Sequence, residues 1–210
     1  MAKVQRVIFL TSNENTNHLY EWLSQRVTVW KLTEKLTLDI ICNWKPDLIV
    51  SYNYSFIIRK DVIDYMNGNI INLHISYLPW NKGASPNFWS FVDDTPKGVS
   101  IHKIVEKLDA GNILYQKEMF FDENVESFQS TYDKLQTAIM QLFIEKWNEI
   151  QSGNYVEFRQ KEKGTYHTMR DLKVLREQCP FEWKDNIAEY LQKYRTKDFI
   201  EEKAHDCNSR

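Results

Sequence analysis

The sequence has few cysteines, and their placement excludes two classes of small protein. Only three occur in 210 residues, Cys42, Cys179 and Cys207, and they are odd in number and far apart. They form neither a disulfide framework nor a set with metal-ligand spacing. A reducing, cytoplasmic location is therefore expected.

The sequence also lacks a long apolar run and an excess of positive charge. Residues 1–7 do not resemble a signal peptide, and no stretch reaches the roughly 18–20 apolar residues that cross a bilayer. Lysine and arginine total 27 against 29 aspartates and glutamates, so no electrostatic term favours a polyanion such as tRNA. Hydrophobic residues at 42% and aromatic residues at 14% can build a core. We expect a soluble, ordered protein.

The first half of the chain alternates between two kinds of apolar pattern. Short runs rich in branched residues predict strands, and apolar residues three to four apart predict helices. The predicted strands are residues 4–10, 27–32, 48–52 and 70–75, and the predicted helices are residues 18–25, 36–44 and 60–66. This order predicts an α/β fold with a Rossmann-like, mostly parallel sheet and helices on both faces.

The pattern changes after Gly98. Residues 99–105 and 113–121 predict two strands around a turn at 108–112, and residues 125–151 predict a long amphipathic helix. We expect a catalytic domain over residues 1–152 and a small C-terminal appendage over residues 153–210. The appendage has short elements near 155–159 and 186–194, and residues 200–210 are expected to form a frayed tail.

Two polar residues stand out on the predicted strand 70–75. Asn72 and His74 are two residues apart, so their side chains share one face. In parallel sheets the ligand crevice lies beyond the carboxyl ends of the strands, where residues 11–17, 53–59 and the stretch after His74 are candidate loops. Taken alone, His74 fits a satisfied core histidine and Asn72 a residue capping backbone amides. Burying both together is costly unless each has a partner.

A series of short motifs continues from this strand. Asn-x-His-x-Ser-x-Leu-Pro starts at Asn72 and is followed by Lys82-Gly83, Pro86-Asn87, residues 95–102 (Thr-Pro-Lys-Gly-Val-Ser-Ile-His) and residues 109–114 (Asp-Ala-Gly-Asn-Ile-Leu). This ordered set resembles the family of formyltransferases that use 10-formyltetrahydrofolate. The order and spacing match over residues 45–118, and the topology matches to about residue 150.

The resemblance implies three catalytic residues, Asn72, His74 and Asp109. By itself Asp109 reads as an ordinary turn residue before a glycine. In formyl transfer, Asn72 and His74 would donate N–H groups to the oxygen of the formyl group. Asp109 would orient His74, bind the incoming amine or take its proton. His102 is expected to be mainly structural or to act through a neighbouring site residue, and the spacing of the five histidines predicts no metal site.

The resemblance also places the folate. The pterin ring is expected to enter a cleft lined by the loop at residues 51–58, although its aromatic residues could instead pack on the core. The residues implied in cofactor binding are Tyr54, Phe56, Ile57, Ile58, Ile104 and Asp109.

Three branches of the family differ in the amine that they formylate. The purine-synthesis branch has a glycine-rich phosphate loop after the first strand, where residues 11–15 contain no glycine. The methionyl-tRNA branch carries a further RNA-contacting domain, for which this chain is short. The branch that formylates nucleotide-linked amino sugars for surface polysaccharide, including lipopolysaccharide O-antigen, matches best, at residues 78–83, 86–89 and 163–167. The residues implied in substrate binding are Trp80, Lys82, Gly83, Pro86, Asn87, Trp89 and Tyr166.

Several points stay open in this interpretation. Lys82 stands where that branch often has arginine, and a lysine cannot bind a diphosphate bidentately. The expected acceptor is a dTDP- or GDP-linked 4-amino or 3-amino deoxysugar, with methionyl-tRNA or glycinamide ribonucleotide as alternatives. A non-catalytic folate- or nucleotide-sugar-binding relative and a folate deformylase are further alternatives. The branch implies a homodimer that binds no nucleic acid and no membrane.

Overall fold

The computed structural model describes residues 3–196, and the predicted tail at 200–210 lies outside them. A six-stranded sheet has the order β2-β1-β3-β4-β6-β7. Its strands are β1 (Arg6–Leu10), β2 (Thr28–Leu32), β3 (Leu48–Tyr52), β4 (Ile70–His74), β6 (Lys97–Lys103) and β7 (Ile113–Met119). The first four pair in parallel, and β6 and β7 are antiparallel, so the predicted α/β fold with a mostly parallel sheet is confirmed.

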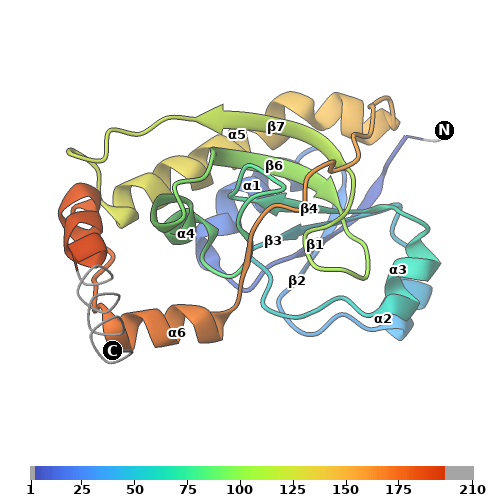
Figure 1. Ribbon diagram of the computed structural model, residues 1–210. Coiled ribbons are helices and arrows are strands. Elements are labelled where there is room, and N and C mark those ends of the chain that lie inside the picture. The colour runs from blue at the N-terminus through green and yellow to red at the C-terminus, as the bar shows by residue number, and fades with distance from the viewer. Residues whose placement is uncertain (1–2, 197–210) are drawn as a thin grey trace.

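The helices follow the predicted order in the first half of the chain (Figure 1). The helices of the whole described chain are the 3-10 turn η1 (Glu14–Thr16), α1 (Asn17–Ser24), α2 (Leu38–Trp44), α3 (Lys60–Met66), α4 (Pro86–Val92), α5 (Phe128–Ser152) and α6 (Met169–Gln178). A further helix covers residues 187–196. Thr37 caps α2 by accepting a hydrogen bond from the Ile40 amide, and a capping box at Ser127 begins α5.

Alternation along the strands separates two hydrophobic cores. Val7 and Phe9 of β1 pack with α1 and α5 on one face, while Ile8 and Leu10 pack with α2 and α3 on the other. All four residues are fully buried, as expected for a strand covered on both sides.

The same alternation continues in β4 with a different outcome. Ile71 and Leu73 join the core beneath α5, whereas Asn72 and His74 point to the opposite face. On that face the core shared with α2 and α3 ends at Ile70, so loops rather than a helix cover the polar side of β4 and β6.

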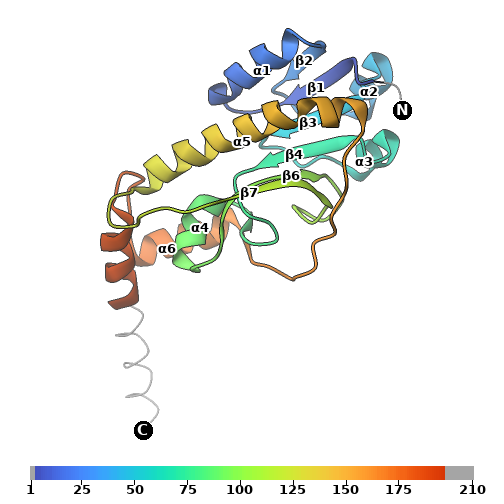
Figure 2. The same ribbon diagram turned by 90° about the horizontal axis from the view of Figure 1, so that it is seen from above.

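The chain after α5 returns to the sheet before it forms its last helices. The orange segment in Figure 1 leaves the end of α5, passes the β6–β7 turn and leads into α6, and Figure 2 shows the same path from above. On this path a two-stranded parallel sheet pairs β5 (Lys82–Gly83) with β8 (Tyr166–His167). A third core then joins α4 to the C-terminal helices through aromatic residues that include Phe88, Phe128 and Phe181.

The sequence patterns did not predict α6 or the β5–β8 sheet. A signal for α6 was present, since Thr168 and Asp171 form a capping box that begins the helix. The two-residue strands have no detectable period, and only their mutual pairing defines them.

Candidate active site

Neighbouring positions of β4 and β6 bring two polar side chains together. Asn72 is in register with His102, so both point to the same face of the sheet. The ring Nδ1 of His102 lies 2.8 Å from the Lys103 carbonyl oxygen, which can only accept, so Nδ1 carries a hydrogen. In the neutral ring, Nε2 then accepts from the Asn72 amide nitrogen at 3.2 Å. This bond uses one Asn72 N–H and leaves the second free.

His74 is buried and donates to a backbone oxygen. Its Nε2 lies 3.2 Å from the carbonyl oxygen of Asn81. Burial lowers the pKa of His74 below its usual value, and the opposing attraction of Asp109 does not overcome it. The ring is therefore neutral near pH 7. The nitrogen-to-oxygen distance of this hydrogen bond is longer than the usual 2.9 Å. An oxygen that carries negative charge can therefore compete with the Asn81 carbonyl for the hydrogen.

Asp109 lies in the β6–β7 connection, which folds back over the polar face of β4. Its backbone is left-handed, with φ of 49°. One carboxylate oxygen, Oδ2, accepts from the Gly83 amide at 2.9 Å and lies 3.9 Å from His74 Nε2, while Oδ1 lies 3.5 Å from His102 Nε2. Burial alone raises the pKa of Asp109, but His74, His102 and the Gly83 amide outweigh it and hold the pKa below its usual range. The carboxylate is ionised.

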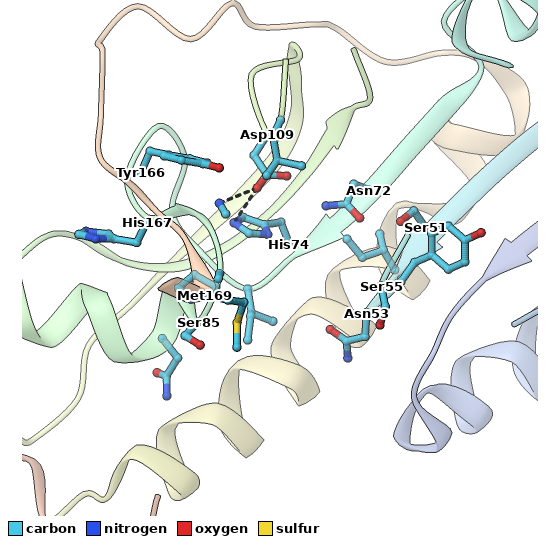
Figure 3. Close-up of a pocket in the computed structure, with 18 of the residues that line it drawn as sticks. Ser51, Asn53, Ser55, Asn72, His74, Ser85, Asp109, Tyr166, His167 and Met169 are labelled. Carbon is cyan, nitrogen blue, oxygen red and sulfur yellow. Dashed lines mark hydrogen bonds and ion pairs between the residues drawn. The ribbon is translucent and has the colours of Figure 1, made fainter. Parts of the chain in front are cut away.

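These groups line the middle of one cavity of about 990 Å³. In Figure 3 the amide nitrogen of Asn72 points toward His74 and Asp109, and the dashed lines join Asp109 to His74 and to the loop at Gly83. Ser51, Asn53 and Ser55 lie on one side of this centre, and Ser85, Tyr166 and Met169 lie on the other (Figure 3). We name the two parts the β3 side (residues 51–58 and 104–108) and the α6 side (residues 83–88 and 166–169).

The structure brings the three predicted catalytic residues together and all of the predicted cofactor residues to the β3 side or the centre. Tyr54, Phe56, Ile57, Ile58, Ile104 and Asp109 all line the cavity. The Phe56 side chain is 43% exposed and Ile57 is 80% exposed, so this wall offers apolar surface that no other part of the described chain covers. A flat aromatic ring system could bury it.

The predicted substrate residues divide into two groups. Gly83, Pro86, Asn87 and Tyr166 line the α6 side of the cavity. Trp80, Lys82 and Trp89 are not among the described residues that line it, and their direct contact with a substrate stays a prediction.

Internal contacts account for two of these three positions. Trp89 is buried beneath the His167 ring, whose centre lies 3.8 Å away in a parallel stack, and His167 Nε2 is 2.7 Å from the Asp93 carboxylate. Lys82 donates to the Lys163 carbonyl oxygen at 3.1 Å, and burial lowers the pKa of its ammonium. Trp80 is half-buried.

Sequence patterns missed several residues of the cavity wall. These are Ser85, Gln129, Tyr132, Thr168, Met169 and Trp183. Most come from α5 and the C-terminal segment, and only the capping box at Thr168 gave a local signal that a helix begins there. Residues 11–17, all described, do not line the cavity, so that loop was a wrong candidate.

No helix within residues 3–196 is both long and apolar enough to span a membrane. The same range holds no cluster of three or more histidine, cysteine, aspartate or glutamate side chains arranged to bind a metal ion.

Comparison with known proteins places this geometry among folate-dependent enzymes. A family model described as formyl transferase matches residues 6–146. The methionyl-tRNA formyltransferase of Geobacillus sp. (strain WCH70) is 34% identical over 155 residues, which is 73% of this chain and 47% of that protein. The chain therefore spans about half the length of the curated relatives that it matches.

Solved structures match over a larger part of both chains. The formyltransferase PseJ from Anoxybacillus kamchatkensis, in complex with UDP-4,6-dideoxy-4-formamido-L-AltNAc and tetrahydrofolate, is 35% identical with a TM-score of 0.79. The match covers 89% of this chain and 97% of that one. A 4-N formyltransferase from Francisella tularensis has a TM-score of 0.74 at 19% identity, over 88% of this chain and 83% of that one, which supports the fold alone.

Proposed function

The chain belongs to the formyl transferase family, and we propose that it transfers the formyl group of 10-formyltetrahydrofolate to the amine of a nucleotide-linked amino sugar. The match to the family model and to a solved formyltransferase confirms the family resemblance that the motifs between residues 72 and 114 indicated. The observation that carries the proposal is the position of Asn72, His74 and Asp109 midway between two differently built sides of one cavity. Such a centre suits a reaction between two separately bound molecules.

The β3 side suits the folate. The exposed Phe56 and Ile57 side chains offer apolar surface to a flat ring, and the loop backbone at 104–108 offers polar groups beside it. When bound there, the folate supplies a formyl group attached to nitrogen. Its carbonyl oxygen would then meet the free N–H of Asn72 and the Nε2–H of His74.

Asn72 and His74 act on the carbonyl oxygen as negative charge develops on it. Asn72 is fixed by His102 before the substrate arrives and keeps its second N–H available, whereas the His74 N–H must turn from the Asn81 carbonyl to the formyl oxygen. Donors that need no reorganisation are the effective ones, and removal of one typically lowers kcat about 10²- to 10³-fold. A neutral His74 also avoids placing a cation beside the incoming amine.

Asp109 acts on the amine. An ionised carboxylate binds and orients the amine at the boundary between the two sides of the cavity. Because its pKa is low, Asp109 is a weak base toward a free ammonium. It takes a proton readily only after the new bond to carbon has made that nitrogen acidic. That proton would then be available to the folate nitrogen, as the original C–N bond breaks and tetrahydrofolate leaves.

The α6 side suits the acceptor sugar and its nucleotide. It offers the exposed Tyr166 ring, the side chain of Asn87 and the first turn of α6 at Thr168 and Met169, and Gln129 of α5 lines the same cavity. A formamide on C4 is what formylation of a 4-amine yields, so the relative in complex with UDP-4,6-dideoxy-4-formamido-L-AltNAc supports a 4-amino sugar. A UDP-linked sugar therefore joins the dTDP- and GDP-linked sugars as an acceptor to be tested. Such sugars are building blocks of surface polysaccharides.

The test is an acceptor panel. The protein is incubated with 10-formyltetrahydrofolate and UDP-, dTDP- and GDP-linked 4-amino or 3-amino deoxysugars, and tetrahydrofolate release and product mass are followed. Asp109→Asn serves as the inactive control. Turnover of methionyl-tRNA or glycinamide ribonucleotide with none of the sugars would overturn the acceptor assignment. Formate release without an acceptor would instead indicate a deformylase.

Dimerisation also stays a prediction. Light scattering of the purified chain distinguishes a homodimer from a monomer. The division at residue 152 is likewise a proposal, although it coincides with the end of α5.

A further inference from the structure

The segment that follows α5 makes contacts with the loop that carries Asp109. We define residues 155–167 as the strap. Ile113 and Phe158 exchange two backbone hydrogen bonds of 2.8 Å, so the strap pairs with the start of β7. Two residues further on, the Gln160 side chain donates to the carbonyl oxygens of Asp109 and Gly111, each at 2.8 Å. Both hydrogens of its amide nitrogen are used on the catalytic loop.

The other end of the strap holds the loop that contacts His74. The Asn81 and Lys82 amides donate to Thr165, the first to its hydroxyl at 2.8 Å and the second to its carbonyl at 3.1 Å. The next two residues of the strap pair with Lys82 and Gly83 as β8 with β5. The strap thereby connects the loop bearing Asp109 to the loop that supplies the Asn81 carbonyl and the Gly83 amide.

The backbone at Asp109 adopts an uncommon conformation. A φ of 49° is disfavoured for a residue with a side chain, so contacts from outside the loop help to stabilise it. Gly111, two residues on, packs closely against the Lys103 backbone, since a Cβ there would lie 1.9 Å from the Lys103 carbonyl oxygen. Gln160 binds the carbonyl groups of both Asp109 and Gly111.

We propose that Gln160 is a positioning residue for formyl transfer, which holds the Asp109 loop so that the carboxylate meets the Gly83 amide and faces His74. The inference rests on the proposed function of Asp109. It extends the active site into the C-terminal segment, beyond residue 146, where the family match ends. Gln160 itself is not among the described residues that line the cavity, so it acts through Asp109 and touches no substrate.

The oxygen of the same side chain is buried. Gln160 Oε1 has no hydrogen-bond partner among residues 3–196, so the hydrogen bonds that hold this side chain are the two that its amide nitrogen donates.

Two substitutions and one matched control test the proposal. Gln160→Met removes both donors at nearly constant length, and Gln160→Glu keeps the shape and polarity but offers only acceptors. Gln192→Met makes the same change on the exposed helix at residues 187–196. The first readout is the backbone amide proton of Gly83 in an NMR spectrum of the full chain, because its hydrogen bond to the Asp109 carboxylate sets its chemical shift.

The Gly83 resonance is expected to move in both Gln160 variants and to stay in place in Gln192→Met. An unchanged resonance in the Gln160 variants overturns the proposal, whichever acceptor the enzyme uses.

The second readout is kinetic. With an active acceptor, kcat is expected to fall roughly 10- to 100-fold in the Gln160 variants while KM for both substrates stays near the wild-type value, because a misplaced catalytic group slows chemistry without weakening binding. The acid limb of the kcat profile moves to higher pH, since an Asp109 carboxylate moved away from His74, His102 and the Gly83 amide loses the interactions that lower its pKa. An increase in KM at constant kcat would contradict a positioning role. A wild-type protein inactive on every acceptor would refute the proposed function and leave the NMR result valid.

Discussion

The side chains on the two faces of strand β4 are buried in different ways. Toward α5, Ile71 and Leu73 lie in an apolar core and are almost fully buried. On the other face, Asn72 donates to His102 of the neighbouring strand β6, and His74 donates to the Asn81 carbonyl in a loop. Residues one position apart therefore serve stability on one side and chemistry on the other.

The difference between the faces lies in what each loses when a partner is removed. The apolar face is stabilised by the burial of apolar surface. Truncating one of its side chains therefore lowers the free energy of unfolding in proportion to the cavity left behind. The polar face is held by individual hydrogen bonds, and its net contribution to stability is small because the same groups bond to water in the unfolded chain. Substitutions on the two faces should thus separate into losses of stability and losses of rate.

The largest effect is expected at Asp109. Replacement by asparagine keeps the volume and an oxygen that can accept from the Gly83 amide, but removes the charge that binds the amine and takes its proton. We expect kcat to fall about 10³-fold, together with a loss of thermal stability at neutral pH, because the folded protein favours the ionised carboxylate. Steady-state kinetics with the active acceptor, beside a thermal melt, measures both. A variant with wild-type kcat would remove Asp109 from the chemistry.

Ile71→Ala breaks the apolar face of the same strand. Ile71 is 1% exposed and does not line the cavity. Its truncation is expected to lower the free energy of unfolding by about 2–5 kcal/mol. Urea denaturation followed by tryptophan fluorescence gives the value. Below the unfolding transition kcat should stay near wild type, and a loss of rate comparable to that of Asp109→Asn would show that the two faces are not separable.

Asn72→Ala makes the matching change one residue further along. One donor to the formyl oxygen is lost, and the expected result is a fall in kcat of about 10²-fold. Because Asn72 also bonds His102, a second variant, Asn72→Asp, keeps the size and lacks the N–H. Equal losses in the two variants support a donor role. Denaturation midpoints close to wild type would complete the contrast with Ile71→Ala.

The smallest expected effect is a change in the free energy of unfolding with pH. Of the two faces of β4, the polar face carries the titrating group, His74. The folded-state pKa of His74 lies below its ordinary value, so the unfolded chain binds the proton more tightly. The contribution of His74 to the free energy of unfolding is therefore fully present above pH 6.5 and declines as the pH falls through that value. The pKa of Asp109 is also lowered, so a second loss begins as the pH falls below 3.8.

Denaturant titrations between pH 8 and pH 5 measure the His74 component. His74→Gln, which does not titrate, should show a weaker dependence than wild type over that range. Ile71→Ala should keep the wild-type dependence, shifted to lower stability throughout. A dependence that is the same in wild type and His74→Gln would assign the titration to another group.

Much of the fold was predictable because its signals are local. The predicted bounds of β3 and α3 match the structure residue for residue, and the other elements of the first half differ at their ends by a few residues. The side chains of Asn72 and His74 share a face because a strand has a period of two, which requires no knowledge of their neighbours. The motif linking them to Asp109 was also visible in the chain.

The C-terminal segment was less predictable for the opposite reason. The strap has no apolar period, and its conformation depends on hydrogen bonds to residues 45 to 84 positions away. The same is true of Trp89, which lies beneath His167 although motif matching suggested a place beside the substrate.

The sequence by itself determined the strands, the helices that cover them and the identity of three polar residues, because these follow from periods and motifs along one stretch of chain. Only the tertiary structure decided that Asp109 meets the Gly83 amide, that His102 orients Asn72, and that Gln160 reaches the catalytic loop. Each of these contacts joins residues from different loops or strands. Its geometry therefore depends on how the whole chain packs, and no local pattern encodes it.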